Sequence, residues 1–394
     1  MSENADRKKI ILYGAGLEGE KFYCKYKNKY DIVCAVDKIH DRKFHEIPVY
    51  SFEKLKEMKL DFLIVVAAIG ITYKAIKQNL EEWGRKEFED FVWAKDFEKK
   101  LCVLYGNCHM IVLEEYLSNN PYFFSQYTIK RYFIHSDPYY RTLPSKEEMS
   151  CCDLLISQDV REGNSHSVPA MQEVRSWTKE GCKCIVIPNL FGCNIYFPQS
   201  RVQTDKRKHI GGTGIVLEGK SDEEICRINE RVEVIEYDPM VINLYKEGKN
   251  TNEIVRILRE EMLYPVNEIQ KRFTEGLQKI EEREKYCDVQ IAWFIRQHYK
   301  EEKLFNSPSH PAKGVICEMG RQCLNLLGIP ISERIPVKAE LDEDEMYVYG
   351  CVKKALGLQF EETYMRNITR GSTLAGCPVN LQEYVEEMIS WAGY

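Results

Sequence analysis

The stretch LCVLYGNCHM, residues 101–110, carries the pattern that decides the fold of most of this chain. The apolar run 101–105 predicts a buried strand, and Gly106-Asn107-Cys108 predicts a tight turn directly after it. Apolar residues then recur at helical spacing on one face, at Met110, Leu113 and Leu117. A strand that passes through a glycine turn into a helix is typical of an α/β fold built on a parallel sheet.

The residues that follow extend this pattern. The apolar runs 154–156 and 184–187 predict two more buried strands, with a helix at 170–179 between them. From about residue 252 to residue 327, the spacing of apolar residues predicts mostly helix. Three residues in this region fall at i, i+3 and i+7 and predict a buried stripe: Tyr286, Val289 and Trp293. We therefore expect a larger α/β domain with a substantial helical part.

The first hundred residues alternate between strand and helix in the same way. Apolar runs predict strands of a parallel sheet at 10–13, 31–36 and 62–68. The charged stretch 95–100 is the expected linker. A chain of 394 residues is too long for one ordinary core. We therefore expect a Rossmann-like domain at residues 1–98 and the larger α/β domain at residues 99–394.

The charge and hydropathy of the chain disfavour several classes of protein. Lys and Arg together number 55 against 61 Asp and Glu, a balance that gives no support for a nucleic-acid partner. Residues 1–9 are polar and no long apolar run follows, so we expect neither a signal peptide nor a transmembrane segment. We expect a cytoplasmic protein whose contact with a membrane, if it has one, is peripheral. A homo-oligomer is compatible with this sequence.

The chain contains 15 cysteines, which a secreted protein would use for disulfides. The spacing Cys-x-x-Cys does not occur, which argues against a zinc ribbon or a thioredoxin-like pair, and we expect no metal site. We expect most of these residues to be small buried side chains in a reducing compartment. In Cys182-Lys183-Cys184, a predicted strand would place both thiols on one face.

A glycine-rich loop opens the first predicted domain. Gly14-Ala15-Gly16-Leu17-Glu18-Gly19 has the spacing G-x-G-x-x-G between a predicted strand and a predicted helix. In that context, the loop glycines Gly14, Gly16 and Gly19 let backbone amides approach a pyrophosphate at the helix N-terminus. Asp37 ends the second strand and is placed to accept hydrogen bonds from a ribose or a base. The alternative is a folded domain that binds nothing and acts as a connector or a dimer surface.

The same region resembles the N-terminal domain of PglD-type sugar acyltransferases. The shared pieces are Leu12-Tyr13-Gly14-Ala15-Gly16, Asp37, Ile47-Pro48-Val49 and Ala68-Ile69-Gly70. The resemblance implies a fold like that of NAD-binding domains but occupied by a UDP-sugar. Because no dehydrogenase acid–base set accompanies the loop, we expect a nucleotide sugar rather than NAD.

The turn at Gly106 is a candidate catalytic centre. A cysteine at the start of a helix has its thiolate stabilised by the helix N-terminus, so Cys108 is a candidate nucleophile. The side chain of Asn107 and neighbouring backbone amides are candidate donors to a developing oxyanion. His109 and, far downstream, His310 are candidate bases. The alternative is a buried cysteine at the end of a strand.

Further candidates would hold the substrate. Gln158 and Arg161 follow a predicted strand, and ligands of α/β proteins collect at the carboxyl ends of strands. The phosphates of a ligand would need cations, and the candidate contacts for such a ligand are Gly106, Gln158, Arg161, Arg201, Lys206 and Arg207. A solvated basic loop is an equally good explanation of the run that contains Lys206 and Arg207.

From residue 101 to the C-terminus, the chain resembles the WcbI family of capsular-polysaccharide biosynthesis enzymes. The matching pieces are Gly106-Asn107-Cys108, Ile187-Pro188-Asn189, Tyr196-Phe197-Pro198, Arg283-Glu284, Leu304-Phe305 and His310-Pro311. The resemblance implies binding of coenzyme A and transfer of an acetyl group from acetyl-CoA to a sugar hydroxyl. The family usually carries Gln where His109 stands here.

Two chemical routes and two other classes of function stay open. Cys108 would relay the acyl group, or a histidine would activate the sugar hydroxyl for direct attack while Cys108 lines the pocket. The turn also resembles the Gly-Asp-Ser block of SGNH hydrolases, which would make the protein an esterase or deacylase. In those enzymes an Asp stands three residues before the histidine, and Ser307 occupies that position here. A non-catalytic nucleotide-binding scaffold is the other alternative.

Overall fold

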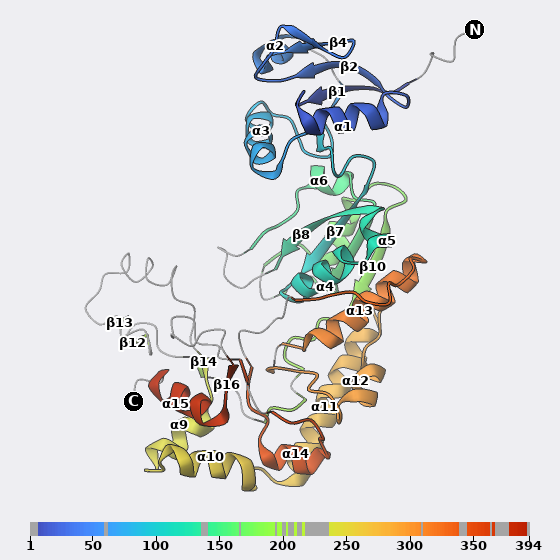
Figure 1. Ribbon diagram of the computed structural model, residues 1–394. Coiled ribbons are helices and arrows are strands. Elements are labelled where there is room, and N and C mark those ends of the chain that lie inside the picture. The colour runs from blue at the N-terminus through green and yellow to red at the C-terminus, as the bar shows by residue number, and fades with distance from the viewer. Residues whose placement is uncertain are drawn as a thin grey trace.

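The protein has a mixed α/β fold with two separate sheets, one mainly parallel and one wholly parallel, and many helices (Figure 1). The computed structural model describes residues 7–58, 62–134, 141–164, 167–193, 195–198, 202–203, 209–210, 215–216, 236–308, 310–338, 345–362, 365–366 and 378–391. The first sheet and the long helical region lie at opposite ends of the molecule, and the second sheet lies between them. In the described part of the chain, no helix is long and apolar enough to span a membrane.

The first sheet has the strand order β3-β4-β2-β1-β5-β6. Its strands are β1 (Lys9–Tyr13), β2 (Asp31–Val36), β3 (Arg42–Phe44), β4 (Ile47–Tyr50), β5 (Leu63–Val66) and β6 (Phe91–Trp93). All neighbours pair in parallel except β3, which runs antiparallel to β4. The helices are α1 (Leu17–Tyr26), α2 (Phe52–Glu57) and α3 (Gly70–Glu82). The parallel sheet expected in this region is thus present.

The second sheet has the order β10-β9-β7-β8 and is parallel throughout. Its strands are β7 (Lys100–Gly106), β8 (Tyr127–Phe133), β9 (Leu154–Gln158) and β10 (Lys183–Ile187). Strand β7 lies in the interior of the sheet and is buried from Leu101 to Gly106, as its continuous apolar run predicts. Because all four strands point the same way, their carboxyl ends form one edge of the sheet.

Helices cover the second sheet and continue beyond it. Helix α4 (His109–Ser118) packs on α13 (Lys313–Leu327) so closely that a Cβ atom at Gly320 would lie 2.4 Å from the ring of Tyr116. The predicted core positions Met110, Leu113 and Leu117 are fully buried. The other helices near this sheet are α5 (Pro121–Phe124), α6 (Lys146–Ser150) and α7 (Met171–Ser176).

The region 252–327, expected to be mostly helical, contains α10 (Thr251–Glu260), α11 (Val266–Glu284), α12 (Ala292–His298) and α13. Further helices lie outside it: α9 (Pro239–Lys246), α14 (Gly350–Leu356) and α15 (Leu381–Trp391). Three two-residue strand pairs accompany these helices: β11 (Val202–Gln203) with β14 (Glu236–Tyr237), β12 (His209–Ile210) with β13 (Ile215–Val216), and β15 (Met365–Arg366) with β16 (Pro378–Val379).

The predicted buried stripe is wrong. Val289 is fully buried, but Tyr286 is 66% exposed and Trp293 is 47% exposed. The three residues do not share a helix, because α11 ends at Glu284 and α12 begins at Ala292. Helical spacing therefore does not place them on one face.

Two neighbouring residues join the first sheet to the second. Phe88 has a positive φ of 68° and packs against the buried clusters of both sheets. The carboxylate of Glu87 lies 2.6 Å from Lys77 of α3 and 3.1 Å from Lys130 of β8. Burial alone would raise the pKa of Glu87, but Lys130, Lys77 and the hydroxyl of Tyr73 outweigh it and lower the pKa. The junction is thus a packed and charge-paired contact.

Candidate functional site

The candidate residues of the second sheet gather where three parallel strands end. Strand β7 ends at Gly106, β9 at Gln158 and β10 at Ile187, and these strands are neighbours in the order β10-β9-β7. Asn107 and Cys108 lie in the loop that follows β7, and Asn189 lies in the loop that follows β10. This is the edge at which ligands of α/β proteins collect.

Gln158 is the centre of a buried hydrogen-bond network. Its side chain is 1% exposed, and its Oε1 accepts from the Asn107 backbone amide at 2.9 Å. Its Nε2 donates to Asn107 Oδ1 at 2.9 Å and lies 3.0 Å from Nδ1 of the fully buried His109. An amide nitrogen only donates, so Nδ1 of His109 accepts and the ring proton of the neutral imidazole sits on Nε2. Gln158 therefore fixes both the turn and the orientation of His109.

Asn107 extends this network to the next strand. Its Oδ1 also accepts from the His109 backbone amide at 3.1 Å, and its Nδ2 donates to Asn189 Oδ1 at 3.2 Å. One of the two Nδ2 hydrogens is therefore directed at Asn189. Asn107 thus closes the start of α4 and ties the loop after β7 to the loop after β10.

Arg283 holds the loop after β10 from the side of helix α11. Its guanidinium donates to the carbonyl oxygen of Asn189, to that of Phe191 at 2.8 Å and to the Cys193 sulfur at 3.3 Å. The next residue, Glu284, accepts from the backbone amides of Ile291 and, at 2.7 Å, of Ala292, where α12 begins. Arg283 and Glu284 therefore brace the loop that carries Asn189 and the start of the following helix.

The turn itself leaves no space for a side chain at Gly106. A Cβ atom there would lie 2.4 Å from Met110 Cε and 2.8 Å from Gln158 Oε1. Cys108 is half-buried and stands at the N-cap position of α4 with helical backbone angles. Its thiol is thus located at the positive end of a ten-residue helix.

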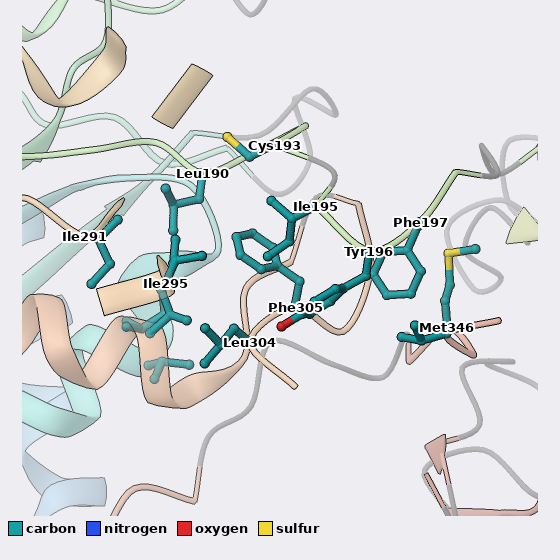
Figure 2. Close-up of a cluster of buried hydrophobic side chains, with 14 of the residues drawn as sticks. Leu190, Cys193, Ile195, Tyr196, Phe197, Ile291, Ile295, Leu304, Phe305 and Met346 are labelled. Atoms are coloured by element: carbon teal, nitrogen blue, oxygen red, sulfur yellow. The ribbon is translucent and has the colours of Figure 1, made fainter. Parts of the chain in front are cut away.

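His310 belongs to a separate hairpin. The Asn306 amide donates to the His310 carbonyl at 2.9 Å, and Ser307 Oγ lies 3.3 Å from His310 Nδ1. Leu304 and Phe305, which precede the hairpin, are buried in a cluster with Leu190, Ile195 and Tyr196 of the segment after β10 (Figure 2). This packing joins the hairpin of His310 to the loop that carries Asn189.

Of the cationic candidates, Arg161 lies in the described part of the chain, three residues after Gln158. Arg161 donates to Asp159 at 2.7 Å, its guanidinium lies 4.8 Å from the ring of Tyr286, and its side chain is 60% exposed. The neighbouring carboxylate raises the pKa of Arg161, so this side chain stays charged. The candidates Arg201, Lys206 and Arg207 lie outside the described residues.

The glycine loop of the first sheet also lies at the carboxyl end of its strands. Gly14 has a φ of +113°, and a Cβ atom at Gly19 would lie 2.0 Å from the Gly14 carbonyl oxygen, so both positions require glycine. A Cβ atom at Gly16 would meet nothing within 4 Å. Asp37 Oδ2 accepts from the Ala15 amide at 2.7 Å, so the carboxylate is part of the loop structure.

Two residues of the network were not singled out as site residues from the sequence. Gln158 was selected because ligands of α/β proteins collect at the carboxyl ends of strands. Asn189 lies just after the carboxyl end of β10, so the same argument applies to it. Arg283 lies far along the chain on α11, and its contact with Asn189 depends on tertiary packing. Both residues stand in the pieces that carry the WcbI resemblance, which was the available signal.

Comparison with known proteins gives information on the family and the fold of this chain. No curated protein sequence matches the chain. A solved structure of WcbI, a novel polysaccharide biosynthesis enzyme, in its native form without a disulfide bond between CoA and a cysteine, is similar in fold. Its TM-score is 0.50 at 16% identity, and the match covers 75% of this chain and 90% of that chain.

Two family models match separate parts of the sequence. Residues 6–89 match the model described as C2185-like, N-terminal, so the expected PglD-type resemblance of this region is not confirmed. Residues 101–208 and 230–332, more than half of the chain, match the model of the polysaccharide biosynthesis enzyme WcbI. The chain therefore belongs to the WcbI family of polysaccharide biosynthesis enzymes.

Proposed function

We propose that this protein transfers an acyl group, such as acetyl, from acyl-CoA to a sugar hydroxyl during the synthesis of a capsular or other surface polysaccharide. The observation that carries the proposal is the position of Cys108 at the N-terminus of α4, directly after Asn107, which is held by Gln158 and Asn189. The membership in the WcbI family and the mention of CoA for the solved WcbI structure support it.

In this proposal Cys108 relays the acyl group. The helix N-terminus favours the thiolate, which attacks the thioester carbonyl of acyl-CoA and releases the CoA thiolate. The exchange of one thioester for another is nearly balanced in free energy, and the later transfer to a sugar hydroxyl is downhill. The Nδ2 hydrogen of Asn107 that is not directed at Asn189 would donate to the oxyanion that forms in each step.

The two histidines have different roles in this proposal. The side chain of His109 is fully buried, and its Nδ1 accepts a hydrogen bond from Gln158. We therefore assign His109 to positioning the turn. His310 is partly exposed, and the hydroxyl of Ser307 orients its ring. We assign His310 as the base that takes the proton of the sugar hydroxyl.

The phosphates of CoA need a cation that stays charged. Arg161 fits this requirement, because its guanidinium is exposed beside the ring of Tyr286 near the end of β9. Arg201, Lys206 and Arg207 are proposed as further phosphate contacts on the ground of the sequence alone. CoA would supply the activated acyl group, while Cys108 would receive it and His310 would take the proton of the sugar hydroxyl.

We also propose that residues 1–98 and 99–394 form two domains and that the first binds a nucleotide sugar. The open space at Gly16, at the N-terminus of α1, supports this idea. Titration of the whole protein with a UDP-sugar and with NAD tests it by calorimetry. Gly16→Val should abolish the UDP-sugar signal, and binding of NAD with redox turnover would contradict the proposal.

The experiment for the main proposal is mixing of the whole protein with acetyl-CoA in the absence of a sugar acceptor. Mass spectrometry of the intact protein should show one acetyl group, and digestion should locate it on Cys108. Cys108→Ala should prevent the labelling while CoA binding, measured by calorimetry, remains. Cys24→Ser, which changes an exposed cysteine of α1, is the matched control and should label normally. The absence of CoA binding at millimolar concentration would refute the proposal.

A further inference from the structure

Two cysteines meet at the edge of the second sheet opposite to Cys108. Cys152 comes two residues before β9 and Cys182 directly before β10, and their sulfur atoms share a hydrogen bond at 3.8 Å. Cys152 is fully buried, whereas Cys182 is partly exposed. Neither takes part in the Gln158 network, so the proposed transfer reaction does not use them. We propose that Cys152 and Cys182 form a thiol–disulfide site that a small-molecule disulfide oxidises reversibly.

Asp153 holds the two thiols in register. Its carbonyl oxygen accepts from the Lys183 amide at 3.0 Å, and its carboxylate accepts from the Leu101 amide at 2.9 Å and pairs with Lys179 at 2.7 Å. The parallel pairing of β9 with β10 begins at Leu154 and Lys183, the residues just beyond this contact. The starts of three strands therefore fix the backbones that carry both sulfurs.

The distance is short enough for a disulfide to form with a local movement. Bonded sulfurs lie about 2 Å apart, so the pair must close by roughly 1.8 Å. Cys182 follows Gly181, which has a φ of +79° in the turn before β10, and nothing within 4 Å would meet a Cβ at that glycine. The backbone of the turn at 179–182 can therefore move Cys182 toward Cys152, while Cys152 stays in the core.

The surroundings give the two thiols different reactivity. A hydrogen bond from Cys152 lowers the pKa of Cys182 against the effect of burial, and Thr178 and the Leu155 amide act in the same direction. Cys184, two residues along, has its pKa raised to about 11 by burial. Cys182 is therefore the attacking thiolate and Cys152 the thiol that resolves the mixed disulfide.

The reaction is an ordinary two-step exchange. The Cys182 thiolate attacks one sulfur of a disulfide R–S–S–R and releases one R–S⁻, which takes up the proton that Cys182 had lost. Cys152 then loses its proton, attacks the Cys182 sulfur and releases the second thiol. Two protein thiols and one small disulfide thus give one protein disulfide and two small thiols, with two electrons passing to the small disulfide.

Oxidised glutathione is the probe for the test. The whole protein is incubated with it, alkylated and digested with trypsin, and the linked peptides are identified by mass spectrometry. Cleavage yields peptide 180–183, whose cysteine is Cys182, and peptide 147–161, which holds Cys151 and Cys152. We expect these two peptides to be linked, and the link to disappear on reduction with dithiothreitol.

Matched variants assign the link. Cys151→Ser and Cys184→Ser should keep it, whereas Cys152→Ser should leave a stable glutathione adduct on peptide 180–183. Cys182→Ser should abolish both the link and any adduct on Cys152. A wild-type protein that keeps glutathione on Cys182 without forming the link, or that remains unmodified at both residues, would overturn the proposal. Labelling of Cys108 is a separate readout and does not affect this result.

Discussion

The segments β1–α1 and β7–α4 both run from a strand through a turn into a helix, but their turns are built differently. The loop between β1 and α1 is built from glycines, and the carboxylate of Asp37, which directly follows β2, accepts from the Ala15 amide. The turn between β7 and α4 is enclosed by side chains, because Gln158, Asn107 and His109 contact one another there. One turn presents its backbone, and the other buries polar side chains.

This difference indicates what each turn can bind. Open space at Gly16 suits a ligand that contacts backbone amides and needs little side-chain chemistry. The second turn has fixed donors and acceptors around a thiol, and such preorganisation is what a reaction with developing charge requires. Substitutions in the first turn should therefore change mainly the stability of the protein, whereas substitutions in the second turn should also change the rate of acyl transfer.

The largest difference should appear in the rate of acyl transfer. Cys108→Ala removes the proposed nucleophile and should lower turnover with acetyl-CoA and a sugar acceptor by about a hundredfold or more. The rate is measured by release of CoA thiol, with Cys24→Ser as the control. Near-normal turnover in Cys108→Ala would favour direct attack assisted by a histidine, and His310→Ala would then be compared with His109→Ala.

The next effect concerns the stability of the first turn. Gly19→Ala places a Cβ atom 2.0 Å from a backbone carbonyl, which has little room to move, so we expect a loss of about 3 kcal/mol in the free energy of unfolding. Gly16→Ala, in the same loop, meets no atom and should cost less than about 1 kcal/mol. Urea titration monitored by circular dichroism compares the two, and equal losses would contradict this account of the loop.

Gly106→Ala is the matching test in the second turn. The new methyl group would press on the flexible end of Met110 and on Gln158 Oε1, so we expect a loss of about 1–3 kcal/mol in the free energy of unfolding. Because Gln158 would shift, turnover should also fall, unlike in Gly16→Ala. Stability and turnover measured on the same preparations separate the two effects. Unchanged turnover would mean that the Gln158 contacts are structural.

The smallest expected effect is that of Asp37→Ala. The variant removes the acceptor for the Ala15 and Ile39 amides, and because this region is near solvent, water can replace part of the loss. We expect a cost of about 1 kcal/mol in the free energy of unfolding and no change in CoA binding. Thermal unfolding and calorimetry measure these quantities, and a loss of CoA affinity would show that the two turns are coupled.

Much of the fold was predictable because its central strands are continuous apolar runs. The buried strand from Leu101 to Tyr105 is an example. The helix after it was predictable from the helical spacing of its buried residues, such as Met110. Strand β8 was not predicted, because Lys130 and Arg131 interrupt its apolar pattern at the edge of the sheet. The helical stripe through Tyr286 failed because the chain leaves the helix after Glu284, and no proline or glycine marks that point.

The site was predictable only in part, for a physical reason. Cys108, Asn107 and Gln158 could be selected because strand ends are visible in the sequence. The direction of the Gln158 amide, which sets the orientation of His109, depends on atoms from two strands and has no local signal. The contact of Arg283 with Asn189 spans 94 positions of the chain and likewise follows from packing.

The junction at Glu87 has a consequence for how the chain is made. During synthesis the first sheet is complete before Lys130 leaves the ribosome, and N-terminal units generally fold first. At that stage Glu87 has Lys77 and Tyr73 but not its third partner, and Phe88 lacks the second cluster to cover it. The face of Phe88 that packs on the second cluster is then in contact with water until the residues of that cluster have been made.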